Sequence, residues 1–174
     1  MFVRPVAALA ALCLIGFVPI SQAADKPTDP QIAHIAYTAG VIDIDNAKQA
    51  IAKSKTKAVV DFANDMLRDH EAVNVQALDL VKKLNVTPED NDTSKALTQA
   101  AAEKREKLAQ LDGAAFDKAY VENEIAYHKQ VNDALETLLI PSADNAELKS
   151  LLETGLQIFQ GHQQHAEHVA MELK

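Results

Sequence analysis

Apolar residues recur every three or four positions along most of the chain, which is the spacing of one face of an α-helix. The first stripe of this kind covers about residues 30–54 and follows Thr28, which can cap a helix with proline at its first position. A second stripe starts after Thr56 and is ended by Pro88. No alternation of apolar and polar residues is long enough to indicate a β-strand. The pattern predicts an all-α protein.

The second half of the chain repeats this organisation. A loop over residues 91–94 precedes a shorter, highly charged helix that ends near Leu111. The next apolar stripe starts at Phe116, includes Leu138 and is stopped by Pro141.

Asp144, followed by Glu147, forms an acidic variant of the capping box and opens the last helix, whose stripe reaches Ala170. Four helices of roughly 25 residues joined by short turns are typical of an antiparallel four-helix bundle. The short charged helix then lies in the middle crossover. We therefore expect one helical bundle domain over residues 24–174.

The first 23 residues have the features of a cleavable signal peptide. Arg4 precedes an apolar core, and Ser21 and Ala23 are the small residues expected three and one positions before a cleavage site. This segment predicts export to the periplasm and a mature chain that begins at Ala24, without an integral membrane segment. Cys13, the single cysteine, lies in the signal, so thiolate ligands and iron–sulfur clusters are excluded from the mature chain.

Composition narrows the classes of function. The chain has 174 residues and a formal net charge of -8, with no basic run, so nucleic acid is not an expected partner. There is no phosphate-binding glycine loop, no dinucleotide fingerprint and no Ser-His-Asp spacing. The sequence thus favours a binding or structural protein over an enzyme.

Several polar residues fall on the apolar faces of the predicted helices, because each residue advances about 100° around a helix. Asp43, His70, Glu124 and His162 each come from a different helix, and His128 lies one turn after Glu124. By the same phase, His34, Asp45, Glu71 and His168 point to solvent.

The axial positions of these residues also agree. Counted from the turn that joins the first two helices, Asp43 and His70 differ in height by about 4–5 Å. Counted from the turn near Ser142, Glu124 and His162 differ by about 3 Å. Each antiparallel pair therefore brings a carboxylate and an imidazole to one level inside the bundle.

Inward carboxylates and imidazoles at one level form the kind of layer that holds metal ions in helical bundles. Asp43, His70, Glu124, His128 and His162 are the candidate ligands, and this mixed set suits Zn, Cu, Fe or Mn. The alternative is a metal-free layer in which the same groups hydrogen-bond one another, in a structural or stress-related protein that acts through its surface.

Two motifs resemble a ferritin-like bacterial family of unknown function that is often labelled "predicted outer membrane protein". They are the run from Asp61 to His70, similar to F-A-x-x-M-x-x-D-H, and the run from Gly113 to Tyr120 followed by His128, similar to G-x-x-F-D-x-x-Y…H. The resemblance implies an exported ferritin-like bundle without an established activity.

Two positions depart from the patterns that this resemblance implies. Asp43 stands where the family commonly has glutamate. The Glu-x-x-His pairs of di-iron ferritins are absent, because Leu67, Ile125 and Phe159 stand three residues before His70, His128 and His162. We therefore expect fewer carboxylates around a metal than in those ferritins.

Overall fold

A computed structural model describes residues 26–173, and all regular structure in this range is helical. The elements are α1 (Asp29–Lys53), α2 (Lys57–Lys83), α3 (Asp92–Ala109), α4 (Gly113–Ala134), the π-helical turn η1 (Leu135–Leu139), α5 (Ile140–Ser142) and α6 (Ala146–Glu172). The all-α prediction is confirmed for this part of the chain. The proposed signal, residues 1–23, lies outside the described residues.

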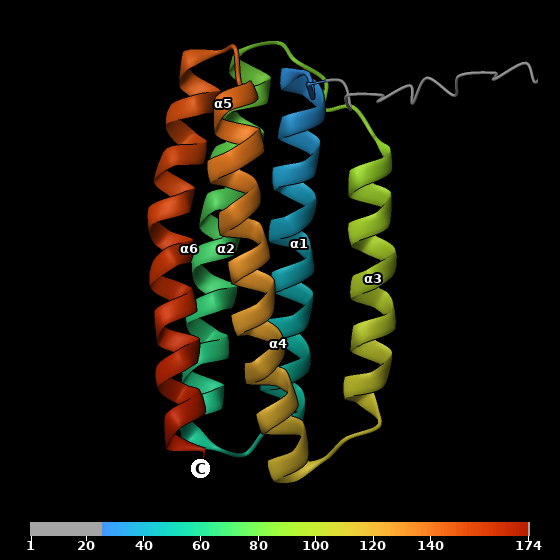
Figure 1. The fold of residues 1–174 in the computed structure, drawn as a ribbon, viewed down its shortest axis with the longest axis vertical. Coiled ribbons are helices and arrows are strands. Elements are labelled where there is room, and N and C mark those ends of the chain that lie inside the picture. The colour runs from blue at the N-terminus through green and yellow to red at the C-terminus, as the bar shows by residue number, and fades with distance from the viewer. Residues whose placement is uncertain (1–25, 174) are drawn as a thin grey trace, which may run out of the picture.

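The four long helices α1, α2, α4 and α6 run side by side, and α3 stands along the outer side of α1 (Figure 1). Helix α1 packs against α2, α4 packs against α6, and α2 also contacts α6. No helix in the described range has the length and apolar character that a membrane span requires.

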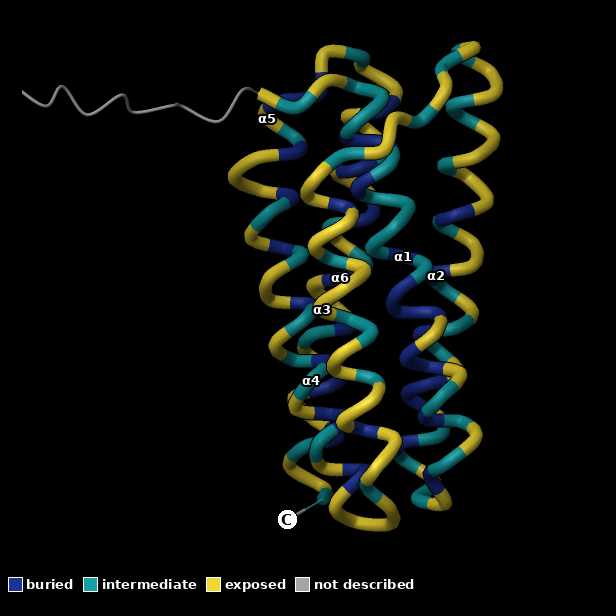
Figure 2. The backbone as a smooth tube through the Cα atoms, turned by 90° about the vertical axis from the view of Figure 1, so that its right-hand side faces the viewer, coloured by how far each residue is buried: buried dark blue, intermediate teal, exposed yellow. Residues whose placement is uncertain are grey.

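Buried residues recur along α1, α2, α4 and α6 (Figure 2), and in α2 they extend from Val59 to Asn74. They form two apolar clusters. One is built around Phe62, Phe116 and Tyr120, and the other around Ile32 and Leu152. In α1, α2, α4 and α6, buried polar residues lie between the members of these clusters. The core is therefore interrupted by one polar layer.

The start of α6 differs from the prediction. Asn145, not Asp144, caps the helix: its Oδ1 accepts hydrogen bonds from the backbone N–H groups of Glu147 and Leu148 at 2.9 and 3.0 Å. Asp144 instead accepts a hydrogen bond from Lys26 Nζ at 2.9 Å. Either residue type can cap a helix, and the position one residue further along the chain has the required geometry.

The end of α4 also departs from regular α-helical phase. Ile140 N–H donates to the carbonyl of Leu135, five residues earlier, so the chain makes a π-helical turn before Pro141. The wider turn rotates the side chains that follow. Leu139 is buried in place of the predicted Leu138, which is 44% exposed.

Helix α3 starts earlier than expected and covers a face of α1. Asn91 caps it by accepting a hydrogen bond from Ser94 N–H at 3.0 Å, so most of the predicted loop forms its first turn. Ser94 Oγ lies 2.9 Å from His34 Nδ1. The prediction that His34 points to solvent is therefore wrong, because helical phase does not reveal that another helix packs on that side.

Candidate functional site

The five residues singled out in the sequence all lie in the polar layer and are all buried. Asp43 comes from α1, His70 from α2, Glu124 and His128 from α4, and His162 from α6. His128, one turn after Glu124, is only 1% exposed. The inward orientation expected from helical phase is thus observed in all four helices.

The three histidines form a compact triangle. The ring centroids of His70, His128 and His162 are 5.3, 5.4 and 5.8 Å apart. One nitrogen from each ring lies within 4.8 Å of one nitrogen on each of the other two rings. A second group of three with the same spacing joins His128 to Asp43 and Glu124, so the five residues form one continuous set.

The Asp43 carboxylate lies between two of the histidines, at distances that distinguish hydrogen bonding from shared binding of a cation. Its Oδ2 lies 3.5 Å from His70 Nε2 and 3.4 Å from His128 Nε2. Hydrogen bonds to a carboxylate are shorter, about 2.7–2.9 Å. Two ligands on one tetrahedral ion, with bonds of 2.0–2.2 Å, lie about 3.3–3.6 Å apart. The spacing therefore fits ligands of a shared cation better than hydrogen-bonded partners.

Hydrogen bonds orient two of the imidazoles toward the centre of the layer. His128 Nδ1 lies 3.0 Å from the carbonyl of Glu124, and His162 Nε2 lies 3.0 Å from Asp69 Oδ2. Because both partners are acceptors, these nitrogens carry the ring protons. The opposite nitrogens, His128 Nε2 and His162 Nδ1, are buried and have no partner in the described structure. Such outer contacts are how proteins orient metal-binding histidines.

The other members of the layer also carry unpartnered atoms. Both ring nitrogens of His70 and both carboxylate oxygens of Asp43 are buried without a hydrogen bond among the described residues. Glu124 Oε1 accepts from Asn46 Nδ2 at 3.3 Å, whereas Glu124 Oε2 is unpartnered. Buried polar atoms normally have partners, and this group of unpartnered nitrogen and oxygen atoms could hold a metal ion.

Burial disfavours the charged form of every ionisable group in the layer. It raises the pKa of Asp43 to about 7 and lowers the pKa of His128 to about 4. Burial and the neighbouring Asp43 raise the pKa of Glu124 well above its ordinary value. Burial also lowers the pKa of His162, and it lowers that of His70 strongly. The imidazoles are therefore neutral at pH 7, the form in which they bind metals.

Two carboxyl groups in this layer have no cationic side chain to neutralise them. The ion pairs of Asp43 and Glu124 in the described structure involve histidines alone. A buried charge without compensation is strongly unfavourable. A divalent cation would compensate both carboxylates at once.

Three further residues contact the candidate ligands, and the sequence pattern did not identify them as part of the polar layer. Asn46 lies one turn after Asp43, and Asp69 directly precedes His70. The ring of Phe159 stacks on His70, with centroids 4.6 Å apart and an interplanar angle of 11°. The inward position of Asn46 could have been predicted, because it lies one helical turn after the inward Asp43. Asp69 sits on the flank of α2, and nothing in the sequence pairs it with α6.

The remaining histidines do not join the layer. The ring of His165 lies perpendicular to that of Phe62, with centroids 5.1 Å apart, and its side chain is 40% exposed. His168 is 66% exposed and lies 3.2 Å from Glu172, in agreement with its predicted solvent position.

The fold and the site define a class of protein: an all-helical protein with a buried layer of imidazoles and carboxylates. The chain belongs to the family described as "Domain of unknown function (DUF4142)", whose model matches residues 18–169. At a significant level, it matches no curated protein and no solved structure. The family description carries no activity, so function has to be argued from the geometry of the layer.

Proposed function

We propose that this protein is an exported metal-binding bundle of the ferritin-like type, in which α1, α2, α4 and α6 enclose a single metal ion and α3 is an additional crossover helix. His70, His128, His162 and Asp43 are the proposed ligands. Glu124 is either a fifth ligand or the partner that balances charge beside Asp43. The observation that carries the proposal is the convergence of buried, unpartnered ligand atoms from all four helices.

The donor set agrees with a first-row transition metal. Three imidazole nitrogens and one or two carboxylate oxygens suit Zn, Cu, Fe or Mn, and the histidine-rich composition sets the site apart from the all-oxygen sites of Mg²⁺ and Ca²⁺. Helices hold each ligand on a rigid backbone, and the contacts of His128 and His162 orient their rings.

The direct test is metal analysis of protein purified without chelators or metal-affinity steps, followed by calorimetric titration of the metal-free protein. We expect one site per chain for at least one of Zn²⁺, Cu²⁺, Fe²⁺ and Mn²⁺. Absence of both bound metal and a binding isotherm would contradict the proposal. The metal-free, hydrogen-bonded layer would then be the correct interpretation.

The pH dependence of binding follows from the protonated carboxyl groups. Asp43 faces His70 on α2 and both Glu124 and His128 on α4. Its pKa of about 7 means that most metal-free molecules hold this proton at pH 5–6 and about half hold it at pH 7, and a bound cation displaces it. Affinity should therefore rise about tenfold per pH unit from 5 to 7 and then level off.

This proton release is measured by calorimetry at pH 6 in buffers of different ionisation enthalpy. At least one proton per ion is expected. Asp43→Asn should weaken binding and remove most of the dependence on pH, because the histidines are already neutral in this range. An unchanged pH profile in Asp43→Asn would show that Asp43 does not contact the ion.

The Asp69 carboxylate should raise metal affinity without contacting the ion. Replacing Asp69 with alanine removes the acceptor that orients His162, and we expect affinity to fall about 10- to 100-fold. Asp65→Ala is the matched control, because Asp65 also pairs with Arg68 but has no hydrogen bond or ion pair with His162 in the described structure. Equal losses in the two variants would point to a general charge effect on α2.

Export is the second part of the proposal and rests on residues 1–23. Expressed with its full sequence in a Gram-negative bacterium, the protein should appear in the periplasmic extract with a mass that starts at Ala24. A cytoplasmic species that retains Met1 would contradict this assignment.

A further inference from the structure

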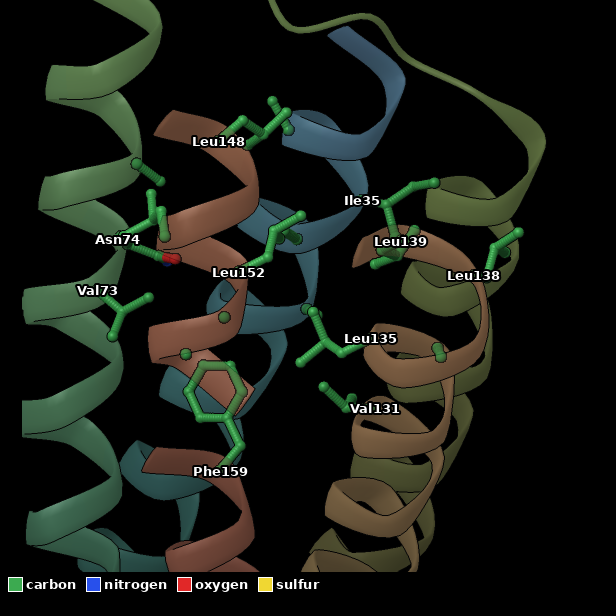
Figure 3. A pocket seen from close by; sticks show the side chains of 18 of the residues that line it. Ile35, Val73, Asn74, Val131, Leu135, Leu138, Leu139, Leu148, Leu152 and Phe159 are labelled. Carbon is green, nitrogen blue, oxygen red and sulfur yellow. The ribbon is translucent and has the colours of Figure 1, made fainter. Parts of the chain in front are cut away.

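An apolar cavity of about 150 Å³ lies beside the polar layer, enclosed mainly by α1, α2, α4, η1 and α6 (Figure 3). Its walls include Ile35, Val73, Leu135, Leu139 and Leu152, which point into a common space (Figure 3). Asn74 is the one buried polar side chain among the lining residues. The cavity therefore suits an uncharged, apolar occupant.

Small residues create this space. Gly155 and five alanines from three helices line it where larger apolar residues would fill the core; the alanines are Ala33, Ala36, Ala39, Ala77 and Ala134. A Cβ atom at Gly155 would meet only the ring of Phe159, at 3.4 Å. Close-packed interiors contain few voids of this size, so the cavity is an exceptional feature of this core.

The π-helical turn shapes one wall. Leu135 and Leu139, the first and last residues of η1, are both buried and both line the cavity. Single π-helical turns inside α-helices are frequent at functional sites. The irregular segment of the bundle therefore coincides with the cavity.

Phe159 separates the cavity from the histidines. Its ring lines the cavity, and it stacks on His70 at a centroid distance of 4.6 Å. The same ring meets His128 edge-on at 6.4 Å. The ring also lies 5.9 Å from that of His162, so a molecule in the cavity would touch the ring that packs against all three histidines of the polar layer.

From this arrangement we infer that the cavity is a binding site for a small, uncharged, apolar molecule, held directly beside the histidine layer. An engineered apolar cavity of about 150 Å³ in another protein stays dry and takes up benzene or xenon. A charged ligand is excluded because the walls offer it no counter-charge and little hydrogen bonding. This site does not depend on a bound metal.

The test uses metal-free, full-length mature protein with benzene and xenon as probes. We expect a saturable ¹²⁹Xe chemical-shift change, a higher melting temperature in the presence of benzene, and movement of the His70 ring signals in a benzene titration. The His168 ring signals should stay in place, because that side chain lies at the surface.

Two glycines of α6 provide a matched pair of variants. Gly155→Leu places a side chain in the cavity, whereas Gly161→Leu places one where no atom lies within 4 Å of the new Cβ. Both replacements remove a helical glycine, so they share the same gain in helix propensity. Benzene affinity should fall roughly tenfold or more in Gly155→Leu and remain unchanged in Gly161→Leu.

If Gly155→Leu does not fold, Ala134→Leu on α4 tests the inference, because it also places a larger side chain in the cavity. The inference is overturned if the wild type gives no saturable xenon shift and no stabilisation by benzene. It is also overturned if a folded filling variant binds benzene as well as Gly161→Leu does. Because the protein is metal-free throughout, neither result depends on the proposed metal centre.

Discussion

Replacing His70 or His162 with alanine is expected to abolish the rise in melting temperature that a bound metal ion produces. The two residues lie on α2 and α6, so an ion held by both ties these helices together. At a free metal concentration 100 times the dissociation constant, binding stabilises the folded state by about 2.7 kcal/mol. For a domain of this size that corresponds to a rise of roughly 5–10 °C. Differential scanning calorimetry with and without metal measures the effect.

The controls are histidines outside the layer. His168→Ala removes an exposed side chain on the same helix as His162, and His34→Ala removes a ring that faces Ser94 of α3. Both variants should keep the full metal-dependent rise. If the rise disappears only in His168→Ala or His165→Ala, the ion binds at the surface of α6 and the buried centre is wrong.

Truncation of Phe62 to alanine should lower the free energy of unfolding by roughly 3–5 kcal/mol. The side chain is fully buried in the apolar cluster on one side of the polar layer, and its ring packs against Tyr120 at a centroid distance of 6.1 Å. Removing it leaves a cavity that the surrounding helices cannot close. Phe116→Ala should have a similar effect, because Phe116 is equally buried in the same cluster. Urea unfolding measures both changes.

Glu71→Ala is the comparison for these truncations. Glu71 lies on the outer face of α2, and its only ion pair in the described structure is a 3.9 Å contact with the exposed Lys48. Such pairs contribute little, so the change should stay below about 0.5 kcal/mol. Comparable losses in Phe62→Ala and Glu71→Ala would contradict the packing described for α2.

Local information predicts much of the helical structure and the inward direction of the candidate ligands. The apolar stripes on either side of Asp43 and His70 set the phase of α1 and α2, and a residue in phase with a stripe must face the core. The short turn between these helices makes them antiparallel neighbours, so counting residues from the turn places the two side chains at similar heights. Glu124 and His162 follow from the same reasoning on α4 and α6.

The sequence predicts local structure less well where two neighbouring residues can take the same role at nearly equal free energy. Asp144 and Asn145 are both good capping residues, and the neighbouring contacts of each residue decide between them. Apolar residues at regular α-helical spacing do not predict a π-helical turn. This spacing therefore predicts Leu138 in the core, whereas Leu139 is the buried residue.

What the sequence alone determined was therefore the all-α class, the main helices and the inward direction of the five candidate ligands, because these depend on periodicities within single segments. The tertiary structure decided which groups meet. It set Asp69 against His162, placed α3 over His34, stacked Phe159 on His70 and left an apolar cavity beside the layer. These features depend on how helices distant in sequence pack against one another, and the pattern along any one helix contains no record of its neighbours.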